Sequence, residues 1–141
     1  MPDIKHVFHI DAPKDKVFSQ LTTRDGLAKW WTEDTVGEAG LGGELAFSFN
    51  GNLLCKMKVM EAESPEKLVW ECVEGYPDWV GTQVVYELSE NEGKTKVHFG
   101  HNGWETQDDF YAQCNFSWGR YMVSLRDLCE KGQGDPWPAH K

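Results

Sequence analysis

The sequence lacks any long hydrophobic run. No apolar stretch approaches the roughly 20 residues that a membrane-spanning helix needs, and the polar N-terminal segment MPDIKHVFHID has no signal-peptide core. Positive charge is also scarce, because 14 Lys and Arg stand against 23 Asp and Glu, which gives a formal net charge of −9. That excess repels the phosphate backbone of nucleic acid and an anionic membrane surface. We therefore predict a soluble cytoplasmic protein with no nucleic-acid partner and no membrane span.

Metal and redox spacings of cysteine are absent too. Cys55, Cys72, Cys114 and Cys129 match no CxxC pattern. Cys114 and Cys129 fall on one predicted helix, where 15 residues span roughly 22 Å, beyond the reach of a disulfide. We predict four buried free thiols. No P-loop, HExxH, Gly-x-Ser-x-Gly or dinucleotide-binding fingerprint occurs, so the sequence predicts neither a metal nor a cofactor.

The 141 residues suffice for one domain with its own core, residues 1–141. Alternation over residues 4–10 predicts a first strand with Ile4, His6, Phe8 and Ile10 on one face. Pro13 then favours the first turn of a helix, because its missing N–H has no helical partner there. The capping-box spacing of Thr22 and Asp25 predicts a second short helix that leads into Trp30-Trp31.

The middle of the chain has the two-residue period of β-strands. Asn50-Gly51-Asn52 between two alternating runs is a hairpin signal, because such residues tolerate positive φ. Short turns between successive runs predict an antiparallel sheet of about six strands. Beyond the first strand, the runs are residues 45–49, 53–59, 68–72, 84–88 and 97–101.

The last part of the chain has a helical period. Thr106, with Asp109 three residues later, predicts an N-terminal cap, and Lys131-Gly132 suits a C-terminus, so we expect a helix over residues 108–131, roughly 36 Å long. Gly119 in its middle indicates either close packing or a local opening. Apolar residues recur at gaps of 4, 4, 3, 4 and 3, at Phe110, Cys114, Trp118, Tyr121, Leu125 and Leu128.

One helix about 10 Å wide cannot cover the whole concave face of a twisted sheet. The remaining space must hold large side chains or a ligand. The chain has 7 Trp, 7 Phe and 4 Tyr, and many fall on the inward phase of the predicted strands.

The order of these elements and several motifs carry a family resemblance. The motifs are Ile10-Asp11-Ala12-Pro13, Trp30-Trp31, Gly42-Gly43-Glu44 and His101-Asn102-Gly103-Trp104. Together they resemble the START-like (SRPBCC) superfamily and, within it, the activator of heat-shock protein 90 ATPase homologue-like group. The resemblance implies an α+β, helix-grip (Bet v-like) fold, in which a curved antiparallel sheet wraps around a long C-terminal helix and two short N-terminal helices assist. Fold does not fix function in this superfamily.

Our leading hypothesis is a small apolar or aromatic ligand held between the sheet and the last helix. The expected cavity is a few hundred Å³ with few polar anchors. The candidate ligand-binding residues are Trp31, Phe47, Phe49, Met57, Trp70, Tyr86, His101, Trp104, Phe110, Cys114 and Trp118.

His101 and Trp79 each have two interpretations. The resemblance implies that the segment from His101 to Trp104 lies near the cavity mouth, so His101 either contacts a ligand or positions structure. His6 and His101 share the inward phase, and in this fold the first and last strands pair, so a two-histidine site is the alternative to two hydrogen-bonded imidazoles. Trp79 is either a lid residue or a cap on the core.

Two other functions and one assembly are left open. The family name suggests a chaperone-associated stress-response protein, although members that stimulate the chaperone ATPase carry an additional N-terminal domain that this sequence does not show. A cyclase- or hydrolase-type enzyme would use His101 as acid or base. A homodimer could form through exposed strand edges or Trp137.

Overall fold

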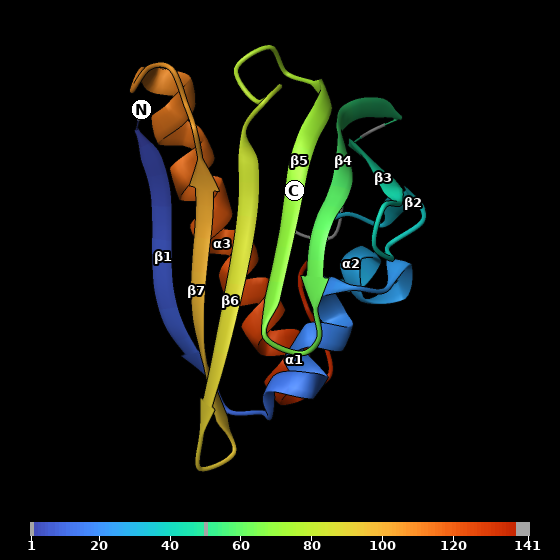
Figure 1. Ribbon diagram of the computed structural model, residues 1–141, viewed down its shortest axis with the longest axis vertical. Helices are drawn as coiled ribbons and strands as arrows, with labels where there is room; N and C mark the ends of the chain where they lie inside the picture. The colour runs from blue at the N-terminus through green and yellow to red at the C-terminus, as the bar shows by residue number, and fades with distance from the viewer. Residues whose placement is uncertain (1, 50, 138–141) are drawn as a thin grey trace.

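The computed structural model describes residues 2–49 and 51–137, and in this part of the chain seven antiparallel strands form one curved sheet (Figure 1). The strand order is β1-β7-β6-β5-β4-β3-β2. One long helix packs against one face, so the helix-grip architecture predicted from the sequence is confirmed. The strands are β1 (Asp3–Ile10), β2 (Asp34–Gly37), β3 (Glu44–Phe49), β4 (Asn52–Glu63), β5 (Lys67–Gly75), β6 (Gln83–Asn91) and β7 (Lys94–Asn102).

The predicted pairing of the first and last strands is confirmed. β1 pairs with β7 over its full length, from Asp3 opposite Asn102 to Ile10 opposite Thr95. This register places Ile4 opposite His101 on the face that meets the helices. β1 is therefore an edge strand, because its other side has no neighbour in the sheet.

β2 is a strand that the sequence analysis missed. It has four residues and pairs with β3, from Asp34 opposite Ser48 to Gly37 opposite Leu45. Four residues with one buried side chain, Thr35, give too short an alternation to stand out in a sequence.

Within residues 2–49 and 51–137, three helices lie on one side of the sheet. They are α1 (Lys14–Leu21), α2 (Arg24–Trp30) and α3 (Asp109–Lys131). In Figure 1, α3 runs behind β7 and β6, where it also contacts β1, while α2 contacts β2 and α3. The two short helices thus cover further parts of the same face.

Both predicted N-caps were wrong by one or two residues. Thr23 caps α2, because its backbone is extended and its hydroxyl accepts a hydrogen bond from the Gly26 amide at 3.0 Å. Thr22 instead ends α1 and donates to the Phe18 carbonyl. Asp108 rather than Thr106 caps α3, with Oδ1 accepting from the Tyr111 amide at 3.1 Å.

The predicted ends of other elements are confirmed. Gly132 ends α3 in the left-handed conformation, with φ of 82°, and its amide donates to the Leu128 carbonyl. In the predicted hairpin turn, Gly51 also has positive φ, whereas Asn50 lies outside the described residues.

Aromatic rings fill most of the space between the sheet and α3. The Trp31 ring lies 5.0 Å from that of Trp118 and 6.2 Å from that of Trp70. The chain of contacts continues from Trp70 to Tyr86 at 5.4 Å, to Phe99 at 5.3 Å and back to Trp118 at 4.8 Å. These rings, each almost fully buried, occupy the centre of the concave face.

The four cysteines are free and buried, as predicted. Burial raises the pKa of Cys72 to about 11 and that of Cys129 to about 12, so these thiols stay protonated near neutral pH. Burial also raises the pKa of Cys55 well above its ordinary value.

The C-terminal tail is held against α2 and β3. The Ser124 hydroxyl, buried on α3, donates to the Trp30 carbonyl at 2.8 Å and accepts from the Asp135 amide at 2.7 Å. The Trp137 ring stacks on Phe49 with centroids 5.5 Å apart. Trp137 therefore packs within its own chain, which disfavours it as the contact that joins two copies.

We predict that Ser124→Ala lowers the free energy of unfolding by about 1–3 kcal/mol, because it removes both hydrogen bonds at a buried site. Urea denaturation measures this value. Ser117→Ala, at an exposed position of the same helix, is the matched control and should change it by less than about 0.5 kcal/mol. Equal effects of the two substitutions would contradict the role given to Ser124.

Candidate functional site

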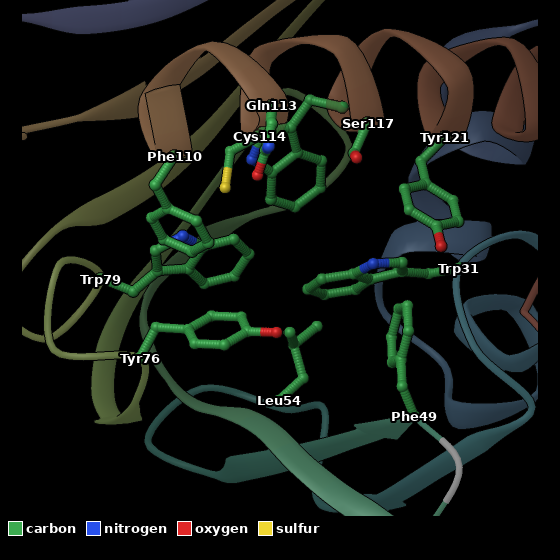
Figure 2. A pocket seen from close by; sticks show the side chains of 11 residues that line it. Trp31, Phe49, Leu54, Tyr76, Trp79, Phe110, Gln113, Cys114, Ser117 and Tyr121 are labelled. Carbon is green, nitrogen blue, oxygen red and sulfur yellow. The ribbon is translucent and has the colours of Figure 1, made fainter. Parts of the chain in front are cut away.

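A pocket of about 200 Å³ opens between the N-terminal half of α3, the loop after β5 and the β3–β4 hairpin (Figure 2). It is smaller than the few hundred Å³ expected from the sequence. Its walls come from four parts of the chain that are far apart in sequence. The lining residues are Trp31, Phe49, Leu54, Tyr76, Trp79, Phe110, Gln113, Cys114, Ser117, Trp118 and Tyr121.

Figure 2 shows two aromatic walls that face one another across the open space. Tyr76, Trp79 and Phe110 form one wall, and Trp31, Phe49 and Tyr121 form the other. Leu54 lies between the walls on the side of β4, opposite the side chains that α3 contributes. The pocket is thus a slot between rings.

Five of the eleven predicted site residues line this pocket: Trp31, Phe49, Phe110, Cys114 and Trp118. Alternation had identified the buried face of most predicted strands, but it carries no information on how deep each side chain lies.

The other six predicted residues lie elsewhere. Phe47, Met57, Trp70 and Tyr86 lie beneath the pocket in the packed core, each fully buried. His101 is also buried and does not line the pocket, and Trp104 borders a separate hollow beside Pro77 and Gly81.

Leu54 reaches the pocket because of a β-bulge. Phe47 pairs with Cys55 and the next residue, Ser48, pairs with Leu53, so Leu54 is the extra residue on β4. A bulge redirects side chains locally. Leu53, the first residue of the run predicted over residues 53–59, is consequently 39% exposed.

Four further lining residues were not predicted as site residues. Gln113, Ser117 and Tyr121 follow one another at helical spacing beside Cys114 and Trp118, and that spacing was a usable signal. Tyr76 lies in a loop, where the sequence has no periodicity and therefore gives no signal for a pocket residue.

Trp79 packs on the core and also lines the pocket. Its ring lines the pocket and also stacks on Trp118 at 5.9 Å, with an interplanar angle of 17°. It is buried, so it belongs to the core as well as to the pocket wall.

A chain of hydrogen bonds through His101 connects the loop of residues 76–82 to the core. Trp118 Nε1 donates to His101 Nδ1 at 3.0 Å, and an indole N–H can only donate, so Nδ1 is the accepting nitrogen. His101 Nε2 then carries the proton and donates to Thr82 Oγ1 at 2.7 Å. Thr82 Oγ1 in turn donates to the Trp79 carbonyl. The imidazole thus connects α3, β7 and the loop of residues 76–82.

His101 has the properties of a structural residue. Burial lowers its pKa to about 3, so the ring is neutral near pH 7 and supplies no general acid there. Both ring nitrogens are engaged, which leaves none for the two-histidine site with His6. In the described part of the chain, no group of three or more His, Cys, Asp or Glu side chains is placed to hold a metal ion.

The pocket lining carries no ionised side chain. None of its eleven residues is Asp, Glu, Lys, Arg or His. Burial raises the pKa of Cys114 to about 11 and that of Tyr121 to about 12, so both remain neutral near pH 7. A pocket of this kind favours an uncharged guest, because a buried charge would lack a partner.

Comparison with known proteins places the chain in a family. Residues 11–130 match the model of the family described as "Activator of Hsp90 ATPase homolog 1-like protein". The chain belongs to this family. The resemblance seen in the sequence is therefore confirmed. No curated protein matches the chain.

Solved structures agree on the fold of this family member. The Aha1 dimer from Colwellia psychrerythraea is 38% identical, with a TM-score of 0.87 over 95% of this chain and 100% of that one. Protein BH1534 from Bacillus halodurans is 23% identical, with a TM-score of 0.75 over 92% and 98%. Protein SSP2350 from Staphylococcus saprophyticus is 16% identical, with a TM-score of 0.77 over 94% and 95%. The last two show the fold alone.

In the part of the chain that the structure describes, no helix has the length and apolar character that crossing a membrane requires.

We predict that the buried neutral His101 makes unfolding easier in acid. Its folded pKa lies below the ordinary value of 6.5, so the unfolded chain takes up the proton first and stability falls as the pH drops below about 6.5. Between pH 7 and pH 5, this one group should cost about 2 kcal/mol of unfolding free energy.

Urea denaturation across this pH range tests the prediction. His101→Gln should be less stable at pH 7 but should lose less stability on acidification. His98→Gln, on the exposed phase of the same strand, is the matched control and should follow the unmodified protein. A slope that His101→Gln leaves unchanged would contradict the prediction.

Proposed function

We propose that this family member binds a small, uncharged aromatic molecule in the pocket between α3 and the loop of residues 76–82. The supporting observation is the slot itself, in which seven aromatic rings and no ionised group surround about 200 Å³. Such a lining gains from burying a planar apolar surface, and it penalises a charged guest.

The volume limits the size of the ligand. A cavity of roughly 150 Å³ accommodates benzene, and drug-sized ligands occupy about 300–1,000 Å³. A pocket of about 200 Å³ therefore suits one ring or two fused rings. Sterols and long-chain fatty acids exceed this volume.

A few neutral polar groups could orient the guest. Ser117 and Gln113 bring a hydroxyl and an amide from α3, and Tyr76 brings its phenol from the opposite side (Figure 2). Each can donate and accept a hydrogen bond. A ring with one hydroxyl, carbonyl or ring N–H would satisfy both the apolar walls and one of these groups.

Isothermal titration calorimetry with indole and 1-naphthol tests the proposal. We expect micromolar binding of one molecule per chain, and at least about tenfold weaker binding to Ser117→Phe, because the new ring fills the slot. Asn115→Phe places the same ring on an exposed position of α3 outside the pocket and should bind normally.

Oleate and cholesterol serve as oversized comparisons. Equal binding to both phenylalanine variants, or binding of cholesterol in preference to the small rings, would contradict the proposal.

The family description favours a second candidate, a chaperone-associated function. If it applies, the purified chain should raise the ATPase rate of purified heat-shock protein 90 in a coupled assay. Absence of both stimulation and binding in a pull-down would leave this candidate without support.

We also propose that the chain forms a homodimer. The support is the Aha1 relative from Colwellia psychrerythraea, a dimer in solution that is 38% identical over 95% of this chain. Sedimentation velocity over a range of concentrations should show a monomer–dimer equilibrium. A monomer at every concentration would refute this proposal.

A further inference from the structure

The outward face of α3 carries a second apolar stripe. Ala112, Phe116, Gly119 and Val123 follow one another at spacings of 4, 3 and 4, on the side of the helix away from the core. Phe116 is 72% exposed and Val123 is 45% exposed. This is the spacing of a seam that packs against another helix, although the buried face of α3 already has its partner in the sheet.

The stripe continues into a groove beside the edge strand β1. The groove has a volume of about 180 Å³ and lies between β1 and α3. Gly119 lines it, and an added Cβ there would meet His6 Cε1 at 3.6 Å, an ordinary contact distance. The absence of a side chain at Gly119 leaves a notch in this wall of the groove. The lining residues are His6, Val7, Phe8, Gly119, Met122, Val123 and Arg126.

We propose that this surface is the interface of the homodimer, with the α3 helices of two copies crossing in antiparallel orientation at Gly119. This inference rests on the proposed homodimer and adds its location and geometry. Phe116 and Val123 lie almost equally far on either side of Gly119 along the helix. A two-fold axis between Gly119 and Arg120 places Phe116 of each copy against Val123 of the other, and Gly119 of each copy near Arg120 of the other.

A second copy suits this surface better than a different partner does. The surface presents both a projecting ring and a notch, so it is complementary to itself under two-fold symmetry. Two copies of a chain with a net charge of −9 repel one another. The stripe itself carries no charge, and the charged residue that lines the groove, Arg126, is positive.

Among the residues that the structure describes, Leu41 has an exposure close to that of Phe116. Leu41 is 70% exposed, but it lies in the glycine-rich loop before β3, next to Gly40 and Gly42. β2, the edge strand on that side, has only four residues. Leu41 is therefore a matched control for exposure and residue type.

Sedimentation velocity of charged variants tests the location. F116E and V123K should each raise the dimer dissociation constant at least about tenfold, as expected for residues at the centre of an interface. L41E should leave it unchanged. Circular dichroism should show the same secondary structure for all three, because both stripe positions are exposed.

Mixing the two stripe variants tests the antiparallel geometry. A mixture of F116E and V123K brings a glutamate of one copy against a lysine of the other, so the mixture should dimerise at least about tenfold more tightly than either variant alone. G119A gives an independent measurement, because alanine favours the helix but fills the notch. G119A should raise the melting temperature of the monomer and weaken the dimer several-fold.

The possible outcomes distinguish the proposed α3 interface from the homodimer on which it rests. If the unmodified chain is a monomer throughout, the proposed homodimer fails and this interface fails with it. If it dimerises but F116E and V123K dimerise as tightly as L41E, the homodimer stands and this location is overturned. If both variants weaken the dimer but their mixture does not recover, the antiparallel arrangement is overturned.

Discussion

A curved sheet offers more concave surface than a single helix can cover, and the rest of this structure depends on how that surface is filled. The indole of Trp118 is central to the solution. Its ring contacts Trp31 and Phe99 in the core, and its N–H fixes the neutral imidazole of His101. The same ring also lines the pocket. The pocket is therefore the space left over after aromatic packing, which explains both its small volume and its position at one side of the concave face.

The periodic features of the fold could be predicted from the sequence. The apolar stripe from Phe110 to Leu128 predicted α3 to within one residue, since a long helix with one buried face repeats the same signal over many turns. Alternation likewise identified the buried phase of five strands. The pairing of β1 with β7 came from the resemblance to a family, because periodicity alone does not say which strands are neighbours.

The features that depend on a single residue or on tertiary distance could not be predicted in the same way. Thr22 and Thr23 carry the same hydroxyl, so the backbone angles at each residue decide which of them caps α2. The local sequence does not determine those angles. The bulge at Leu54 depends on the relative register of two strands. Tyr86 lies deep in the core while Phe49 reaches the pocket, although both occupy inward positions of strands, since depth is set by how the sheet curves around α3.

The buried thiols give this protein built-in reporters of its own opening motions. An alkylating reagent attacks the thiolate, which burial suppresses, so modification of Cys55, Cys72 and Cys129 must await exposure of each sulfur to solvent. Cys129 lies on α3, whereas Cys55 and Cys72 lie on neighbouring strands of the sheet, β4 and β5. The order in which these three sites become labelled therefore records whether the helix separates from the sheet before the strands themselves come apart.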